Sequence, residues 1–265
     1  MATKAERAGA APAVSMDSTF ASAGGQLSAH LATPNTLERE VPGLVLCHGF
    51  PTGIASAADS ANSFPQLADR IAREMGWAVL TFNFRGAGRS EGDFSLQNWL
   101  DDVHAAIDHL STVERVRAVW LAGFGTGGAL CICAGATRPE VQGVAALGVP
   151  ADFDDWANHP RRLLQHAREL GLIKRQSFPA SIDAWSRELR SIRPSQAVAK
   201  LAPRPMLVIH GSEDEAVPNF DARDLTDGHG SAELRIIDGA GHQLRHDPRA
   251  VAVLMGWLDR QQHLA

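Results

Sequence analysis

Histidine and carboxylate side chains follow several short apolar runs in this chain. His48 comes directly after one run, Asp214 lies three residues after Gly211, and His242 follows Gly241. A carboxylate beside a histidine can make the imidazole a general base that takes a proton from water or from a substrate. These residues can act together only if the strands and helices of the fold bring a carboxylate next to a histidine.

Several apolar runs end in glycine or turn residues and predict buried strands. They are 43–47, 77–84, 118–122, 141–149, 205–209 and 233–237. Nearly continuous apolar strands indicate a sheet covered on both faces, which is usually parallel. Apolar residues at helical spacing occupy 64–75, 96–110, 126–136 and 248–260. The alternation predicts a doubly wound, mostly parallel α/β sheet, preceded by an antiparallel hairpin over 14–20 and 26–31.

The segment of about 152–200 interrupts this alternation. It is helical in pattern, includes Trp156 and Trp185, and is too long for a simple crossover between two strands. We expect a small helical cap over the carboxyl edge of the sheet. The domain prediction is one α/β domain over 14–265 with this cap inserted, after a disordered leader over 1–13 that lacks the apolar segment of a signal peptide.

Composition excludes several classes of partner. The net charge of −5 offers no basic field for nucleic acid, and no apolar run approaches the roughly 20 residues of a membrane span. Cys47, Cys131 and Cys133 lie in apolar segments, and the i, i+2 pair has no second pair to complete a zinc site. We expect buried, reduced thiols in a cytoplasmic protein that uses no metal and no cofactor and binds a small molecule.

The segments that follow the predicted strands carry a resemblance to a known family. Ligands of such sheets bind at the carboxyl ends of the strands. The motifs there are, in order, His48-Gly49-Phe50-Pro51, Gly123-Phe124-Gly125-Thr126-Gly127, Gly211 to Pro218, and Gly239 to His242. From about Gly43 onward the chain resembles the α/β-hydrolase superfamily. The stretch from Asn83 to Gly92 further resembles a group of small bacterial serine hydrolases. The resemblance implies an esterase-type site for a small-molecule substrate.

The position that holds the nucleophile in this family is a glycine here. The family pattern is Gly-x-Ser-x-Gly on a tight strand-to-helix turn, and its central residue corresponds to Gly125. Gly125 has no side chain and cannot form an acyl-enzyme, although glycine adopts the strained turn at little cost. A shifted frame with Thr126 as nucleophile would place Phe124 at a position that requires a small residue. Cys131 and Cys133 lie one to two helical turns further on, which is too far from the turn for either thiol to replace the nucleophile.

The resemblance also assigns residues to the other parts of the site. It makes Asp214 the acid, His242 the base, and the backbone N–H groups of Phe50 and Thr126 the oxyanion hole. Arg85 is expected to brace its loop. Histidines expected at the surface are His104, His109, His166 and His246. The acidic run of Asp152, Asp154 and Asp155 offers an alternative acid or cation site, and such runs are usually solvated loops.

Four interpretations stay open at this point. The first is an enzyme that works without the elbow nucleophile, with Asp214 and His242 acting on water or on a substrate proton. The second is a non-catalytic pseudo-hydrolase that binds a small ligand or a partner. The third is an engineered Ser→Gly variant of a serine hydrolase. The fourth is dinucleotide binding, because Gly123, Gly125 and Gly128 match G-x-G-x-x-G, although the next acidic residue at a strand end, Asp152, comes late.

Overall fold

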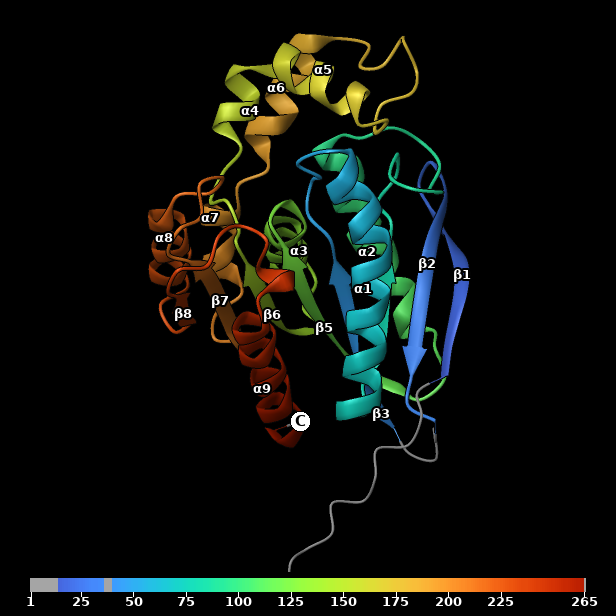
Figure 1. Cartoon of the computed structure of the whole chain (residues 1–265), viewed down its shortest axis with the longest axis vertical. Helices are drawn as coiled ribbons and strands as arrows, with labels where there is room; N and C mark the ends of the chain where they lie inside the picture. Colours follow the sequence, from blue (N-terminus) through green and yellow to red (C-terminus); the bar gives the residue numbers. More distant parts are fainter. Residues whose placement is uncertain (1–13, 36–39, 265) are drawn as a thin grey trace, which may run out of the picture.

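An eight-stranded sheet runs through the centre of the computed structural model (Figure 1). The structure describes residues 14–35 and 40–264, without the side chains of residues 57–59, 61, 263 and 264. The strand order is β1-β2-β4-β3-β5-β6-β7-β8. β2 pairs antiparallel with β1 and with β4, and the other pairs are parallel, which confirms the predicted sheet. The strands are β1 (Val14–Ser22), β2 (Gly25–Thr33), β3 (Val41–Cys47), β4 (Ala78–Phe82), β5 (Val116–Phe124), β6 (Val141–Leu147), β7 (Met206–Gly211) and β8 (Glu233–Ile237).

Helices cover both faces of the sheet, and the strand sequences explain why. Every residue of β3 is buried, and alternate side chains of a strand point to opposite faces. Leu44 and Leu46 pack in one core with α1 (Ile54–Met75) and α9 (Pro248–Leu264). Val45 packs in the other core with α2 (Leu96–Ser111), α3 (Thr126–Thr137) and α8 (Asn219–His229). Burial of each such side chain stabilises the fold by about 1.5–3 kcal/mol.

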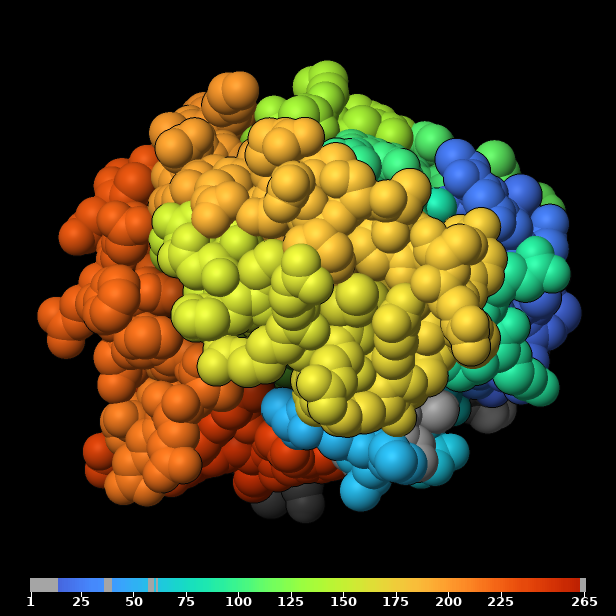
Figure 2. All heavy atoms as spheres, turned by 90° about the horizontal axis from the view of Figure 1, so that it is seen from above, coloured from blue at the N-terminus to red at the C-terminus, as the bar shows by residue number. Residues whose placement is uncertain are grey.

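Four short α-helices and a 3-10 helix (Val198–Lys200) lie between β6 and β7, and three of the α-helices form a layer above the sheet (Figure 1). The helices are α4 (Asp154–Asn158), α5 (Pro160–Glu169), α6 (Ile182–Ser191) and α7 (Pro194–Ala197). We call the layer formed by α4, α5 and α6 the cap. Figure 2 shows the cap covering most of the upper face, with the segments that follow β3 and β8 at its edge.

A buried carboxylate fastens the cap to the segment after β4. Asp93, whose side chain is 1% exposed, accepts hydrogen bonds from the backbone N–H groups of Lys174 and Arg175 and from the Arg175 guanidinium. Burial raises the pKa of Asp93, but these donors outweigh it and hold the pKa below its usual value. The Phe94 N–H also donates to the carbonyl of Leu172 at 2.9 Å, so the cap is anchored at several points.

Two helices differ from the sequence-based expectation. α1 begins at Ile54, ten residues before the expected start, because its first turns carry mostly small residues and give no amphipathic pattern. α8 was not predicted, since Ala222 and Leu225 are too few apolar residues to show a helical period. The predicted leader, 1–13, lies outside the described residues. Of the helices in the described ranges, none combines the length and the apolar character that crossing a membrane requires.

Candidate active site

Gly125 forms the turn between β5 and α3, in a backbone conformation that favours glycine. Its φ of 51° and ψ of −127° lie outside the common regions for other residues. The glycines two residues before and two residues after it are needed because a side chain there would clash with the backbone. A Cβ on Gly123 would lie 2.5 Å from the nitrogen of Gly128, and one on Gly127 would lie 2.2 Å from the carbonyl oxygen of His48. The turn is therefore the tight strand-to-helix elbow that the sequence predicts.

The position where a side chain of residue 125 would begin faces His242. A Cβ built on Gly125 would lie 3.5 Å from Nε2 of His242 and 3.8 Å from the Cα of Gly49. All of its neighbours stand at ordinary van der Waals distance. A Cβ at residue 125 would therefore fit and point toward the imidazole, and the cavity that Gly125 and His242 line leaves room for a water molecule.

Asp214 orients that imidazole from its other side. Oδ2 of Asp214 lies 2.9 Å from Nδ1 of His242, and Oδ1 accepts from the N–H groups of Ala216 and Val217 at 2.9 Å each. The Asp214 side chain is fully buried. Burial raises the pKa of the Asp214 carboxyl, but the hydrogen bonds from His242, Val217 and Ala216 outweigh it and lower the pKa. A charged Asp214 fixes the proton of His242 on Nδ1 and leaves Nε2 as the basic nitrogen at the elbow.

Phe50 and Thr126 border the same space. Thr126 is the first residue of α3, so its N–H is among those that a helix leaves without an intrahelical partner. Phe50 lies in the segment after β3. Both residues line one cavity together with Gly125 and His242. The N-terminus of α3 and the imidazole of His242 therefore border the same cavity.

That cavity extends from the elbow to the underside of the cap and has a volume of about 450 Å³. Its apolar wall includes Phe50, Phe153, Trp156, Leu163, Val217 and Phe220, and its polar residues are Thr52, Thr126, Asp152, Asp155, His166, Asp221 and His242. Neither Phe220 nor Asp221 stands out in the sequence, because α8 carries too few apolar residues to show a helical period. Helical spacing after the Val217-Pro218 motif could have placed them near the site.

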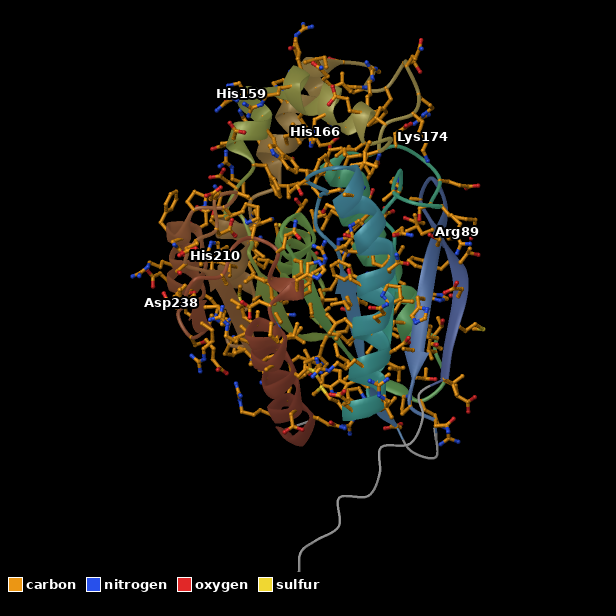
Figure 3. All side chains as sticks on the ribbon, viewed as in Figure 1. Arg89, His159, His166, Lys174, His210 and Asp238 are labelled. Carbon is orange, nitrogen blue, oxygen red and sulfur yellow. The ribbon has the colours of Figure 1, made fainter. Side chains whose placement is uncertain are left out.

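His166 lies at the surface, as the sequence predicts, with a side chain that is 42% exposed, and it also reaches the cavity. It lies on α5 in the cap and lines the cavity, with its ring centroid 6.0 Å from that of Phe50 (Figure 3). The sequence showed a polar residue on a polar helix. The sequence did not show that α5 also presents this residue to the space below the cap.

Other residues named from the sequence have structural contacts. Burial lowers the pKa of His48 to about 4, and its Nε2 accepts from the N–H of Phe84. Arg85 braces its loop, as expected: its guanidinium donates to the fully buried Asp102 at 2.6 and 2.9 Å. His210, which does not stand out in the sequence, lies well below the cap in Figure 3, with Nε2 3.0 Å from the Val217 carbonyl oxygen and 3.7 Å from Oδ2 of Asp214.

The acidic run is mostly ion-paired. Asp154 pairs with Arg193 at 2.7 Å and Asp155 with Arg162 at 2.8 Å, and within the described ranges no three potential metal ligands gather into a site. All three cysteines are buried and free of disulfides.

Comparisons with known proteins agree with this architecture. A model of the alpha/beta hydrolase family matches residues 44–254. 2-Hydroxymuconate semialdehyde hydrolase from Pseudomonas sp. strain CF600 is 24% identical over 252 residues, covering 81% of this chain and 86% of that protein. The uncharacterized protein YfhR of Escherichia coli O157:H7 is 28% identical over 148 residues, 55% of this chain and 45% of YfhR. The matched region thus spans less than half the length of YfhR.

Solved structures show the same fold. Est1E from Butyrivibrio proteoclasticus aligns with a TM-score of 0.72 and 21% identity, covering 94% of this chain and 99% of Est1E. The esterase domain of a Rhodothermus marinus protein aligns with a TM-score of 0.67 and 25% identity, covering 94% and 97% of the two chains. With a family model that matches most of its length, this chain belongs to the alpha/beta hydrolase family.

Proposed function

We propose that this protein hydrolyses a small ester by direct attack of water, without an acyl-enzyme. The observation that carries the proposal is the Asp214–His242 pair, whose free Nε2 faces the space beside Gly125. A protein that had lost the reaction altogether would have no need to keep a buried carboxylate on a histidine at this point. The esterase names of similar structures support an ester as the substrate class.

The steps follow from the positions of the groups. Nε2 of His242 takes a proton from water while the water oxygen bonds to the carbonyl carbon of the ester. The backbone N–H groups of Phe50 and Thr126 donate to the resulting oxyanion. When the tetrahedral intermediate collapses, the bond to the alcohol oxygen breaks and Nε2 returns its proton to that oxygen. Asp214 stays charged throughout and stabilises the imidazolium.

The single variant that tests the proposal is His242→Ala, with 4-nitrophenyl acetate as substrate. A positioned general base contributes roughly 10²–10⁴-fold to a rate, so we expect kcat/KM to fall by roughly that factor. His246→Ala is the matched control, because His246 is exposed and lies outside the cavity. Equal rates for the wild type and His242→Ala would contradict general-base catalysis by this residue.

The competing interpretation is a pseudo-hydrolase that only binds its ligand. Gly125, which removes the nucleophile, is the observation that favours it. The same assay separates the two: a binding protein would release no more 4-nitrophenol than buffer does, in the wild type and in both variants.

A further inference from the structure

The carboxylates that line the cavity differ in whether an arginine lies close enough to pair with them. Asp155 is held by Arg162, and Oδ2 of Asp152 lies 3.9 Å from Arg193. Asp221 has no such partner among the described residues. It is 8% exposed, and its Oδ2 accepts from the N–H of Ala151 at 3.0 Å.

The second oxygen of Asp221 is the feature that points to a ligand. Oδ1 accepts no hydrogen bond from the described part of the chain, although the residue is more than nine-tenths buried and lines the cavity. Oδ1 is open to the cavity and has no donor from the described residues, so it can accept a hydrogen bond from a ligand there. The position of Asp221 in the first turn of α8 explains a favourable helix-dipole interaction, but it does not explain an oxygen left open toward the cavity.

The remaining wall suits a positive charge. No lysine or arginine is among the described residues that line the cavity. Aromatic rings form a continuous surface there: the Trp156 centroid lies 5.0 Å from that of Phe50 and 5.3 Å from that of Phe153. Aromatic faces attract cations, and they attract them more strongly where water is excluded. Burial, together with the neighbouring charge of Asp152, raises the pKa of Asp221, and the Ala151 N–H and His210 only partly offset this rise.

We propose that the substrate carries an alkylammonium group, which donates to Oδ1 of Asp221 and packs against the aromatic wall of the cap. The ester of this substrate then lies at the Gly125–His242 end of the same cavity. The inference rests on the proposed function for the identity of the reacting bond, but the binding of the cation does not depend on hydrolysis.

The test compares benzylammonium with benzyl alcohol, which has a similar shape but no charge, by isothermal titration calorimetry on the full chain at neutral pH. We expect the wild type to bind benzylammonium at least ~10-fold more tightly, since hydrogen bonds to charged groups contribute more than neutral ones. Asp221→Asn keeps an oxygen for the Ala151 N–H and removes the charge, so it should bring the two affinities within about twofold.

Asp224→Asn is the matched control, because it makes the same charge change at an exposed position of the same helix. It should leave the preference for benzylammonium unchanged. Equal affinities of the wild type for the two probes would overturn the proposal even if Asp221→Asn did not fold, and so would equal effects of the two variants. Neither probe contains an ester, so loss of the preference and loss of 4-nitrophenyl acetate hydrolysis are separate results.

Discussion

The point where a β-carbon of residue 125 would lie is 3.5 Å from Nε2 of His242. A serine introduced there would place its hydroxyl beside a base that Asp214 already orients. The site therefore keeps the geometry of an activated nucleophile at a position that has no side chain.

We predict that Gly125→Ser converts the protein into a covalent hydrolase. The variant should react with a fluorophosphonate probe and give a burst of 4-nitrophenol, because the hydroxyl can lose its proton to His242. Mass spectrometry of the labelled peptide provides the measurement. The wild type should not label at this position, and Gly125→Ser combined with His242→Ala should label far more slowly.

The same substitution should lower stability. A residue other than glycine at φ 51° and ψ −127° costs about 1–3 kcal/mol of strain, while the Cβ itself meets no atom closer than 3.5 Å. Urea unfolding of Gly125→Ala measures this cost without a hydroxyl. Gly125→Ala and Gly125→Ser should be destabilised to a similar extent; a much larger loss in Gly125→Ser would indicate a polar conflict rather than backbone strain.

Much of this site could be predicted because its parts depend on the local backbone. The tight elbow needs glycines at 123 and 127, and these show in the sequence. Asp214 and His242 follow strands whose apolar runs are plain, so their placement at one sheet edge follows from parallel pairing. The sequence could not place His166 or Asp221, since each is polar on a short helix with few apolar residues. Their exposure to the cavity depends on how the cap and α8 pack.

Asp214 should make the unfolding free energy depend on pH in the acid range. Its pKa in the folded state lies below the ordinary value of 3.8, so its contribution to stability is fully present above pH 3.8 and is lost as pH falls through the folded-state pKa. Chemical denaturation of the wild type and Asp214→Asn at several pH values gives the measurement. The stability difference between them should shrink toward low pH, and Asp183→Asn, on the exposed side of α6, is the control.

The Arg85–Asp102 pair should contribute strongly to stability because both side chains are buried. Asp102 is fully buried and accepts from the Arg85 guanidinium, the Arg85 N–H and the Ser22 hydroxyl. Asp102→Ala leaves the guanidinium buried without its partner, so we expect a loss of about 3–5 kcal/mol in urea unfolding. Glu74→Ala removes the exposed i, i+4 pair with Arg70 and should cost no more than about 0.5 kcal/mol. Equal losses would show that burial does not set the size of the effect.

Asp93 should control the attachment of the cap to the sheet. Its carboxylate accepts from the backbone of Lys174 and Arg175, two residues after which trypsin cleaves. Asp93→Ala removes the acceptor that holds this segment, so limited trypsin digestion should cut after Lys174 and Arg175 faster than in the wild type, because local opening exposes the segment. Asp183→Asn, which changes a charge elsewhere on the cap, should be cut at the wild-type rate. An unchanged rate for Asp93→Ala would mean that other contacts, such as the Phe94–Leu172 hydrogen bond, are enough to hold the cap.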